Sequence, residues 1–260
     1  MLHTIQSIHI YPIKSLGGIN LREGKALKSG MQYDRNWMLV DDANVFMTQR
    51  IHHEMCLFQQ SIEGEMLVVR YGDAQLDIPL QHLDRDQETA QIWDDSASVY
   101  EVNPEISQWF SQHLQKSCRL MRISSTFERM HKKKGNLEMS LSDGYPYLVV
   151  GTGSLANLNT LLDQDVVMDR FRPNIVVHTD TAHTEDTWGE YAIGSAGFKS
   201  SHPCARCNLI TINPDTALAG KEPLKTLSTY RKVGNRVNFG MNVFCESEGK
   251  LSVGDTIIFA

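Results

Sequence analysis

Two cysteines and an arginine lie within four residues of one another in the second half of the chain. Cys204, Arg206 and Cys207 follow Pro203 and precede an alternating apolar run over residues 209–212, so we expect a turn at the mouth of a strand. A cation beside a thiol favours the thiolate, which is the form that attacks electrophiles and binds metals. No other segment of the sequence combines as many reactive groups in so short a space.

The pair Cys204 and Cys207 is compatible with three chemistries. A thioredoxin-like couple normally opens a helix early in a βαβ unit, whereas this pair lies late and precedes a strand. A structural zinc site needs further ligands, but Cys56, Cys118 and Cys245 stand apart and no His pair has zinc-finger spacing. The third chemistry is one thiolate on a soft or redox-active metal carried by an organic cofactor. Residue types and spacing leave all three open.

Two cations in the first forty residues lie where the chain turns. Lys14 follows an expected strand over residues 5–13 and precedes glycines, so its simplest interpretation is a solvated turn lysine. Arg35 lies just before an expected buried strand over residues 37–40. Its alternatives are an ion pair with Asp34 or another carboxylate, or contact with an anionic ligand.

Two later segments also have the chemistry for anion binding. An expected buried strand over residues 147–150 leads into Thr152, Gly153, Ser154 and a helix, which points backbone N–H groups and a helix dipole at one place. The glycine spacing is not a full nucleotide fingerprint, so a plain helix N-cap is the default interpretation. Arg172 precedes another expected strand and either pairs internally or faces a cleft.

Composition limits the class of protein. The chain has 260 residues, 41% hydrophobic residues and a formal net charge of −6, which excludes a general nucleic-acid footprint and requires any anion site to be local. Five irregularly spaced cysteines do not make a disulfide framework, so we expect a reducing, cytoplasmic location. The N-terminus lacks the basic and apolar segments of a signal peptide, and no apolar run is long enough to span a membrane.

The pattern of elements favours a mainly β fold. Many short apolar runs are separated by turn signals, and they do not alternate with helices as a doubly wound sheet requires. Asn103 and Pro104 predict the start of a helix. One face of that helix carries four apolar side chains: Ile106, Trp109, Phe110 and Leu114. Residues 128–144 are polar and basic, which predicts a loop near a domain boundary.

A series of short motifs, taken in order, resembles the MOSC family, which is named for the C-terminal domain of molybdenum cofactor sulfurases. The motifs lie at residues 11–15, 33–37, 154–159, 171–175, 185–188, 206–207 with 213–216, and 253–255. The resemblance implies a smaller β-rich N-terminal domain over residues 1–122 and a β-barrel MOSC domain with a few helices over residues 123–260. Within the family, the chain is similar to the mitochondrial amidoxime-reducing components and to bacterial enzymes that reduce N-hydroxylated bases.

The resemblance implies a molybdenum cofactor, in which a molybdopterin dithiolene holds the metal. The family's protein ligand is the cysteine that follows arginine, so Cys207 is the expected metal ligand and catalytic residue, and Cys204 is its neighbour. The expected cofactor contacts, carried over from the family, are Lys14, Ser15, Arg35, Thr152, Gly153, Ser154, Arg172, Asn174 and Arg206. Cations and helix N-terminal amides at such positions suit a phosphate group, which carries about −1.5 to −2 charges at neutral pH.

The resemblance also implies an activity, namely molybdenum-dependent reduction of N-hydroxylated compounds. We expect no N-terminal targeting segment and no C-terminal ferredoxin domain, and the cysteines do not fit an iron–sulfur spacing. Electrons would then come from a separate ferredoxin-like protein, flavoprotein or cytochrome b5-like protein. One alternative is a module that binds or carries the cofactor or sulfur without turnover. Another is a thiol–disulfide oxidoreductase, which would depend equally on Cys204 and Cys207.

Overall fold

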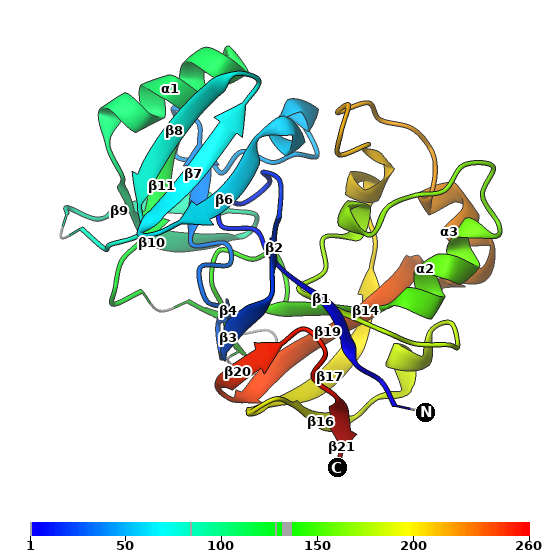
Figure 1. The fold of residues 1–260 in the computed structure, drawn as a ribbon. Helices are drawn as coiled ribbons and strands as arrows, with labels where there is room; N and C mark the ends of the chain where they lie inside the picture. Colours follow the sequence, from blue (N-terminus) through cyan, green and yellow to red (C-terminus); the bar gives the residue numbers. More distant parts are fainter. Residues whose placement is uncertain (1, 84, 128, 132–136) are drawn as a thin grey trace.

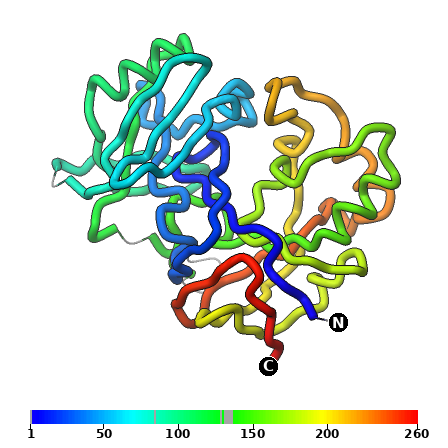
Figure 2. The backbone as a smooth tube through the Cα atoms, viewed as in Figure 1, coloured from blue at the N-terminus to red at the C-terminus, as the bar shows by residue number. Residues whose placement is uncertain are grey.

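The computed structural model describes residues 2–83, 85–127, 129–131 and 137–260. The described chain forms five β-sheets and three α-helices, so the predicted mainly β fold is confirmed. Figure 1 shows one group of strands around β14, β17 and β19, and a second group around β7, β8 and β11 with helix α1 on its outer side. The tube in Figure 2 shows the N-terminal segment running between these two groups.

The largest sheet has nine strands in the described chain. Its path is β2-β1-β15-β14-β19-β17-β16-β21, with β18 paired to β19. The strands are β1 (Ile5–Ile10), β2 (Ile19–Leu21), β14 (Tyr147–Gly151), β15 (Ile175–Val177), β16 (Glu190–Ile193), β17 (Ala196–Ala205), β18 (Lys232–Val233), β19 (Arg236–Ser247) and β21 (Ile257–Phe259). Strands β14 and β15 run parallel, and β1 runs antiparallel to β15.

Four smaller sheets complete the strand content of the described residues. One contains β5 (Trp37–Val40), β9 (Glu88–Ile92), β10 (Asp95–Glu101) and β11 (Arg119–Ile123). A second contains β6 (Gln59–Glu63), β7 (Met66–Tyr71) and β8 (Ala74–Pro79). A third contains β3 (Glu23–Leu27), β4 (Gly30–Met31) and β20 (Gly249–Ser252), and the fourth is the pair β12 (Met130–His131) and β13 (Leu137–Glu138).

The first thirty residues pair with strands from the second half of the chain. Strand β1 pairs with β15, and β3 pairs with β20. The two ends of the chain also meet, because the backbone N–H of Ile257 donates to the carbonyl of His3 at 2.8 Å. The division predicted after residue 122 falls inside β11 and stays a prediction. These pairings bring Lys14 and the other N-terminal motif residues beside the C-terminal half.

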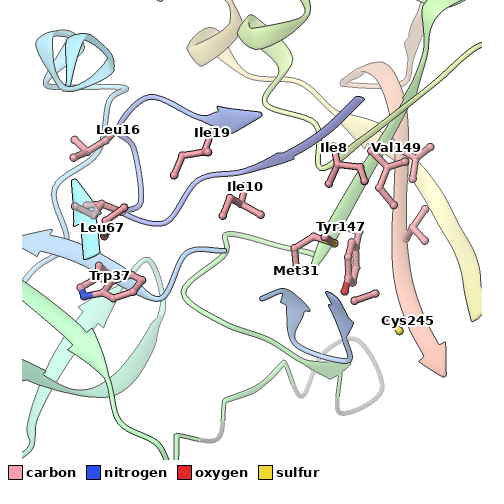
Figure 3. Close-up of a cluster of buried hydrophobic side chains, with 14 of the residues drawn as sticks. Ile8, Ile10, Leu16, Ile19, Met31, Trp37, Leu67, Tyr147, Val149 and Cys245 are labelled. Carbon is pink, nitrogen blue, oxygen red and sulfur yellow. The ribbon is translucent and has the colours of Figure 1, made fainter. Parts of the chain in front are cut away.

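One continuous core joins the two groups of strands. Its buried side chains include Trp37 and Leu67 from the group with α1, and Tyr147, Val149 and Cys245 from the large sheet. Figure 3 shows these side chains at opposite ends of the cluster, with Ile8, Ile10 and Ile19 of β1 and β2 lying between them. Burial of apolar surface therefore fixes the relation between the two halves, on which any site between them depends.

Helix α1 (Pro104–Leu114) begins as the sequence predicts. The side chain of Asn103 accepts a hydrogen bond from the backbone N–H of Glu105 at 2.7 Å, which satisfies one of the unpaired donors at the helix start. Ile106, Phe110 and Leu114 are buried on one face. The other helices are α2 (Thr152–Asn159), α3 (Leu224–Tyr230) and the 3₁₀ segments η1 (His53–Leu57), η3 (Met168–Phe171), η4 (Thr184–Thr187) and η5 (Asn208–Thr211).

The strand predicted over residues 209–212 is wrong, because η5 covers this segment. Strand β17 precedes the cysteine pair, and its ladder with β19 ends at Ala205 opposite Asn238. The Arg206 N–H still donates to the Val237 carbonyl of β19, and the chain then closes 3₁₀ bonds such as the one from the Ile210 N–H to the Cys207 carbonyl. Ile212, just after η5, forms an isolated bridge with Ala219. Ile210 and Ile212 are both buried, so the burial of these two side chains does not distinguish a strand from a 3₁₀ segment.

Candidate functional site

A cavity of about 450 Å³ lies between the two halves of the chain. Its walls come from the turn after β1, the segment before β14, the turn before β15, and the segment from the end of β17 to η5. Seven of the residues proposed from the sequence line it: Lys14, Ser15, Arg35, Arg172, Asn174, Arg206 and Cys207. Segments almost two hundred residues apart in sequence therefore converge on one concave surface.

Positive charge dominates the wall of this cavity. Among the described residues, six cationic side chains line it: Lys14, Arg35, Arg50, Arg172, Arg206 and Arg236. The described part of the lining contains one carboxylate, Asp143. A second carboxylate, Asp34, is fully buried and hydrogen-bonded to the lining residue Arg35. A local excess of cations in a chain of net charge −6 indicates a site for an anionic ligand.

Lys14 is buried, so its interpretation as a solvated turn lysine is wrong. Its side chain is 7% exposed, donates to the Leu141 carbonyl at 2.8 Å and forms an ion pair with Asp143. Burial lowers the pKa of Lys14, and the neighbouring carboxylate opposes that change. For Asp143, burial acts to raise the pKa, but the ammonium of Lys14 outweighs it and holds the pKa well below its usual range. Arg50 pairs with the same carboxylate at 3.0 Å.

Two guanidinium groups lie over one aromatic ring at the cavity floor. The central guanidinium carbons of Arg35 and Arg172 are 4.4 Å and 4.1 Å from the centroid of the Tyr11 ring. Burial lowers the pKa of Arg172 to about 10, which still leaves it protonated at neutral pH. The one hydrogen bond of its guanidinium in the described chain goes to the Leu16 carbonyl at 2.7 Å, and no carboxylate pairs with it there.

The buried carboxylate of Asp34 holds this group of cations in place. It accepts hydrogen bonds from the backbone N–H of Tyr11 at 2.7 Å, from Arg35, and from the Asn174 side chain at 3.1 Å. Asn174 also accepts from the Leu148 backbone at 3.2 Å. Arg35 therefore pairs with Asp34, as one interpretation proposed, and also faces the cavity. The Asn174 side chain serves mainly to join the β14 and β15 segments to Asp34.

The two cysteines at the cavity differ in their surroundings. The Cys204 thiol accepts a hydrogen bond from Arg206 at 3.2 Å, and Arg206 also donates to the Phe171 carbonyl at 2.7 Å. All five cysteines lie in the described part of the chain and are free thiols. Within that part, the thiol of Cys207 alone has no hydrogen-bond partner. Its half-buried thiol thus faces the cavity without a protein partner.

The chain is similar to known proteins over almost its whole length. Residues 2–117 match the family model of the MOSC N-terminal beta barrel domain, and residues 136–258 match the model of the MOSC domain. Mitochondrial amidoxime reducing component 2 of Rattus norvegicus is 31% identical over 278 residues, which cover 98% of this chain and 82% of that protein. The chain belongs to the MOSC family. The resemblance inferred from the short motifs is confirmed.

A second type of relative matches the MOSC chain equally broadly. Molybdenum cofactor sulfurase of Homo sapiens is 29% identical over 287 residues, which cover 98% of this chain but 32% of that protein. Among solved structures, the YUAD protein from Bacillus subtilis aligns at 9% identity and a TM-score of 0.46, over 99% of this chain and 94% of that one. The family assignment rests on the sequence matches.

The turn at Thr152, Gly153 and Ser154 does not line the cavity of this MOSC chain. The hydrogen-bond donors at the start of α2 already have acceptors within the chain. The Gly153 N–H donates to the Thr179 hydroxyl at 3.0 Å, and the Ser154 hydroxyl donates to Glu185 at 2.7 Å. The Gly151 N–H donates to the same Glu185 oxygen at 3.1 Å. Burial raises the pKa of this carboxyl, and the Ser154 and Gly151 donors oppose the rise. We therefore leave residues 152–154 out of the site.

Replacing Gly151 with alanine should destabilise the protein by about 1–3 kcal/mol, the usual cost of overpacking a core. A Cβ there would lie 2.6 Å from the Thr179 hydroxyl and 2.7 Å from Glu185 Oε2, so both groups must move. Gly189→Ala is the matched control, because no atom lies within 4 Å of its added Cβ. Urea unfolding measures both variants. Equal midpoints would contradict the close packing of Glu185 against α2.

Sequence reasoning missed several residues of the cavity wall. They include Arg50, Asp143, Tyr145, His202 and Asn242. The sequence offered little reason to choose them. Asp143 lies near the end of the segment predicted to be a polar loop, and His202 lies just before Pro203 and the cysteine pair. The part of that loop at residues 128 and 132–136 lies outside the described residues.

In the described part of the chain, no group of three or more His, Cys, Asp and Glu side chains is arranged to hold a metal ion, so the Cys204–Cys207 pair has no such companions there. No helix in that part is long and apolar enough to cross a bilayer.

Proposed function

We propose that this MOSC protein binds a molybdenum cofactor in the cavity and reduces N-hydroxylated compounds, with electrons from a separate redox protein. The observation that carries the proposal is that the Cys207 thiol, which has no partner in the described part of the chain, meets Arg172, Arg206 and their neighbours on one wall. The similarity to amidoxime reducing components supports the substrate class, since amidoximes are N-hydroxylated amidines. The donor would be ferredoxin-like, a flavoprotein or cytochrome b5-like.

The residues present fit such a cofactor. A half-buried cation without a counter-ion is unfavourable, and a phosphate group would supply the missing charge beside Arg172. The Nε of Arg206 is buried and has no hydrogen-bond partner in the described chain, so it can donate to a ligand in the cavity. A thiolate is the soft ligand that molybdenum on a dithiolene accepts. Charge, donors and sulfur are therefore all of the right kind.

The chain's own side chains bind and orient the cofactor in this proposal. Lys14, Arg35 and Arg172 would hold the phosphate, and Cys207 would bind the metal. When bound, the cofactor supplies two-electron redox chemistry at molybdenum. Phe171 and Leu148 contribute apolar surface to the wall, which limits the access of water to the reacting groups.

The full chain, made in a host that synthesises molybdopterin, provides the test. We expect molybdenum by elemental analysis, the fluorescence of oxidised pterin, and reduction of benzamidoxime to benzamidine with reduced methyl viologen as electron donor. Protein that retains neither metal nor pterin would contradict cofactor binding. Protein that carries both but leaves the amidoxime unchanged would contradict the reductase activity.

A second candidate function is a module that binds the cofactor or its sulfur without turnover. The observation in its favour is the similarity to the human sulfurase, which is nearly as high as that to the amidoxime reducing component. Stoichiometric cofactor without amidoxime reduction would favour this alternative. Turnover that requires Cys207 would exclude it.

A further inference from the structure

A basic surface lies next to the cavity, where the large sheet ends. This basic surface consists of residues 221–236, which include α3, β18 and the start of β19. It contains one carboxylate, that of Glu222, and five cations: Lys221, Lys225, Arg231, Lys232 and Arg236. Since the whole chain has a net charge of −6, the basic surface is opposite in sign to the remainder of the protein.

Most of these cations are available to a partner. All of them except Arg231 are exposed, and none of the exposed ones pairs with a carboxylate in the described part of the chain. Arg231 itself is half-buried and pairs with Asp186. Apolar side chains lie among the cations, since Tyr230 is 37% and Val233 is 70% exposed. Aromatic side chains and arginines are enriched where proteins bind one another, and unpaired charge selects a partner of the opposite sign.

The basic surface is joined to the segment that carries the candidate metal ligand. Arg236 belongs to this surface and also lines the cavity. The next residue of β19, Val237, accepts a hydrogen bond at its carbonyl from the Arg206 N–H at 2.7 Å, and Arg206 precedes Cys207. Helix α3 also packs against η5, which begins directly after Cys207. One hydrogen bond and a short run of covalent bonds therefore connect the basic surface with Cys207.

Packing and backbone pairing hold the basic surface in a fixed position beside the cavity. Leu227 of α3 is buried in one cluster with Phe239 of β19 and Leu158 of α2. Figure 1 shows α3 beside α2, on the opposite side of the molecule from α1. Strand β18 pairs with the start of β19, and the Asn238 N–H donates to the Arg231 carbonyl at 3.0 Å. A partner bound here would lie at a defined distance from the cavity.

Electron tunnelling slows steeply with distance, so a redox protein that reduces a half-buried site has to dock close to it. We propose that the basic surface docks the separate electron donor, and that this donor presents a carboxylate-rich face around its prosthetic group. The inference rests on the proposed function. Complementary charge steers such a partner to the surface, and a small contact area is sufficient for a transient electron-transfer complex. Electrons enter along β19 and the Arg206 segment, and reach the Cys207 side of the cavity.

The proposed reaction sets the number of docking events. Reduction of an N-hydroxylated substrate follows R–NHOH + 2 D(red) + 2 H⁺ → R–NH₂ + H₂O + 2 D(ox), where D is a donor that carries one electron. The N–O bond breaks, two donor molecules are oxidised in successive encounters, and both protons come from solvent. Because a donor binds and leaves twice in each turnover, a weak and charged contact suits the reaction better than a large apolar one.

A membrane is the other kind of partner that a basic surface with exposed apolar side chains could bind. Here the surface includes Arg236, a residue of the cavity wall. A bilayer laid against it would cover that part of the wall and hinder the entry of substrate, whereas a donor protein leaves again after each electron. The position of the surface therefore favours the donor protein.

Titration calorimetry of the full chain without cofactor tests the docking alone. The probes are a plant-type ferredoxin, a flavodoxin and the soluble domain of cytochrome b5, three acidic redox proteins of the classes proposed above. At low salt we expect at least one probe to bind, and the double variant Lys225→Glu, Lys232→Glu to weaken its Kd roughly tenfold. High salt should remove the difference, because it screens exposed charges. Lys25→Glu with Lys116→Glu is the matched control, because both lysines are exposed, lie outside the basic surface and change the net charge equally.

Turnover of the cofactor-loaded protein separates the docking surface from the proposed activity. In the Lys225→Glu, Lys232→Glu variant, kcat/KM for the donor protein should fall, whereas turnover with reduced methyl viologen, which needs no protein contact, should match wild type. Equal binding in this variant and the control, or no binding of any acidic probe, would overturn the docking surface. Binding to phosphatidylserine vesicles but to none of the three proteins would assign the surface to a membrane instead.

Failure of the proposed function would have a different signature. Wild-type protein that carries the cofactor but reduces no amidoxime with any donor, methyl viologen included, would overturn the reductase activity. The calorimetry without cofactor would still decide whether the basic surface binds acidic redox proteins.

Discussion

A Cys207→Ser variant should lose amidoxime reduction down to the background rate of the assay. Serine keeps the size of the side chain but replaces a soft thiolate by a hydroxyl that is not ionised at neutral pH, and soft metals prefer sulfur. The thiol is half-buried and has no hydrogen-bond partner among the described residues, so its replacement removes no interaction that holds the fold. Turnover with methyl viologen, molybdenum content and the thermal unfolding midpoint are the three measurements.

Cys204→Ser is the matched control, because Cys204 lies three residues away and lines the same cavity. Its thiol accepts from Arg206 at 3.2 Å, a role that a serine hydroxyl can also fill. We expect this variant to keep molybdenum and most of its turnover. Equal loss in the two variants would point instead to a thiol–disulfide couple, and full activity of Cys207→Ser would remove the ligand assignment.

Local sequence signals predicted the elements of the fold that depend on near neighbours. Asn103 and Pro104 mark the start of α1 because capping is decided within one helical turn. The apolar run at Tyr147–Gly151 becomes β14, which is buried along its whole length. The run over residues 209–212 was mistaken for a strand, because the availability of a partner strand is decided elsewhere in the chain.

The site was predictable where residue type offered a candidate and the resemblance to the family chose among the alternatives. Arg35, Arg172 and Cys207 could be proposed from the sequence, and they do line one cavity. The burial of Lys14 could not, since it depends on Asp143, more than one hundred residues later. Nor could the exclusion of the 152–154 turn, because the group that occupies it is the Glu185 carboxylate, some thirty residues further along the chain.

The largest expected effect on stability belongs to Asp34. Its carboxylate is fully buried and binds the Tyr11 backbone, Arg35 and Asn174 at once. Asp34→Ala leaves the guanidinium of Arg35 near the buried Tyr11 ring without its counter-ion, and breaking a buried pair in this way costs about 3–5 kcal/mol. Urea unfolding of the variant without cofactor should show this loss as a lower midpoint.

Two further variants serve as comparisons for Asp34→Ala. One removes only the charge of Asp34, and the other breaks an exposed ion pair elsewhere in the chain. Asp34→Asn keeps an oxygen for the Tyr11 N–H but removes the charge, so its midpoint should lie between those of wild type and Asp34→Ala. Glu63→Ala breaks the exposed pair with Arg70 and should leave the midpoint unchanged, because solvent screens such pairs. If Asp34→Ala were as mild as Glu63→Ala, the cations at the cavity floor would not depend on Asp34. Interactions other than those with this carboxylate would then have to hold the cationic side chains in place at the site.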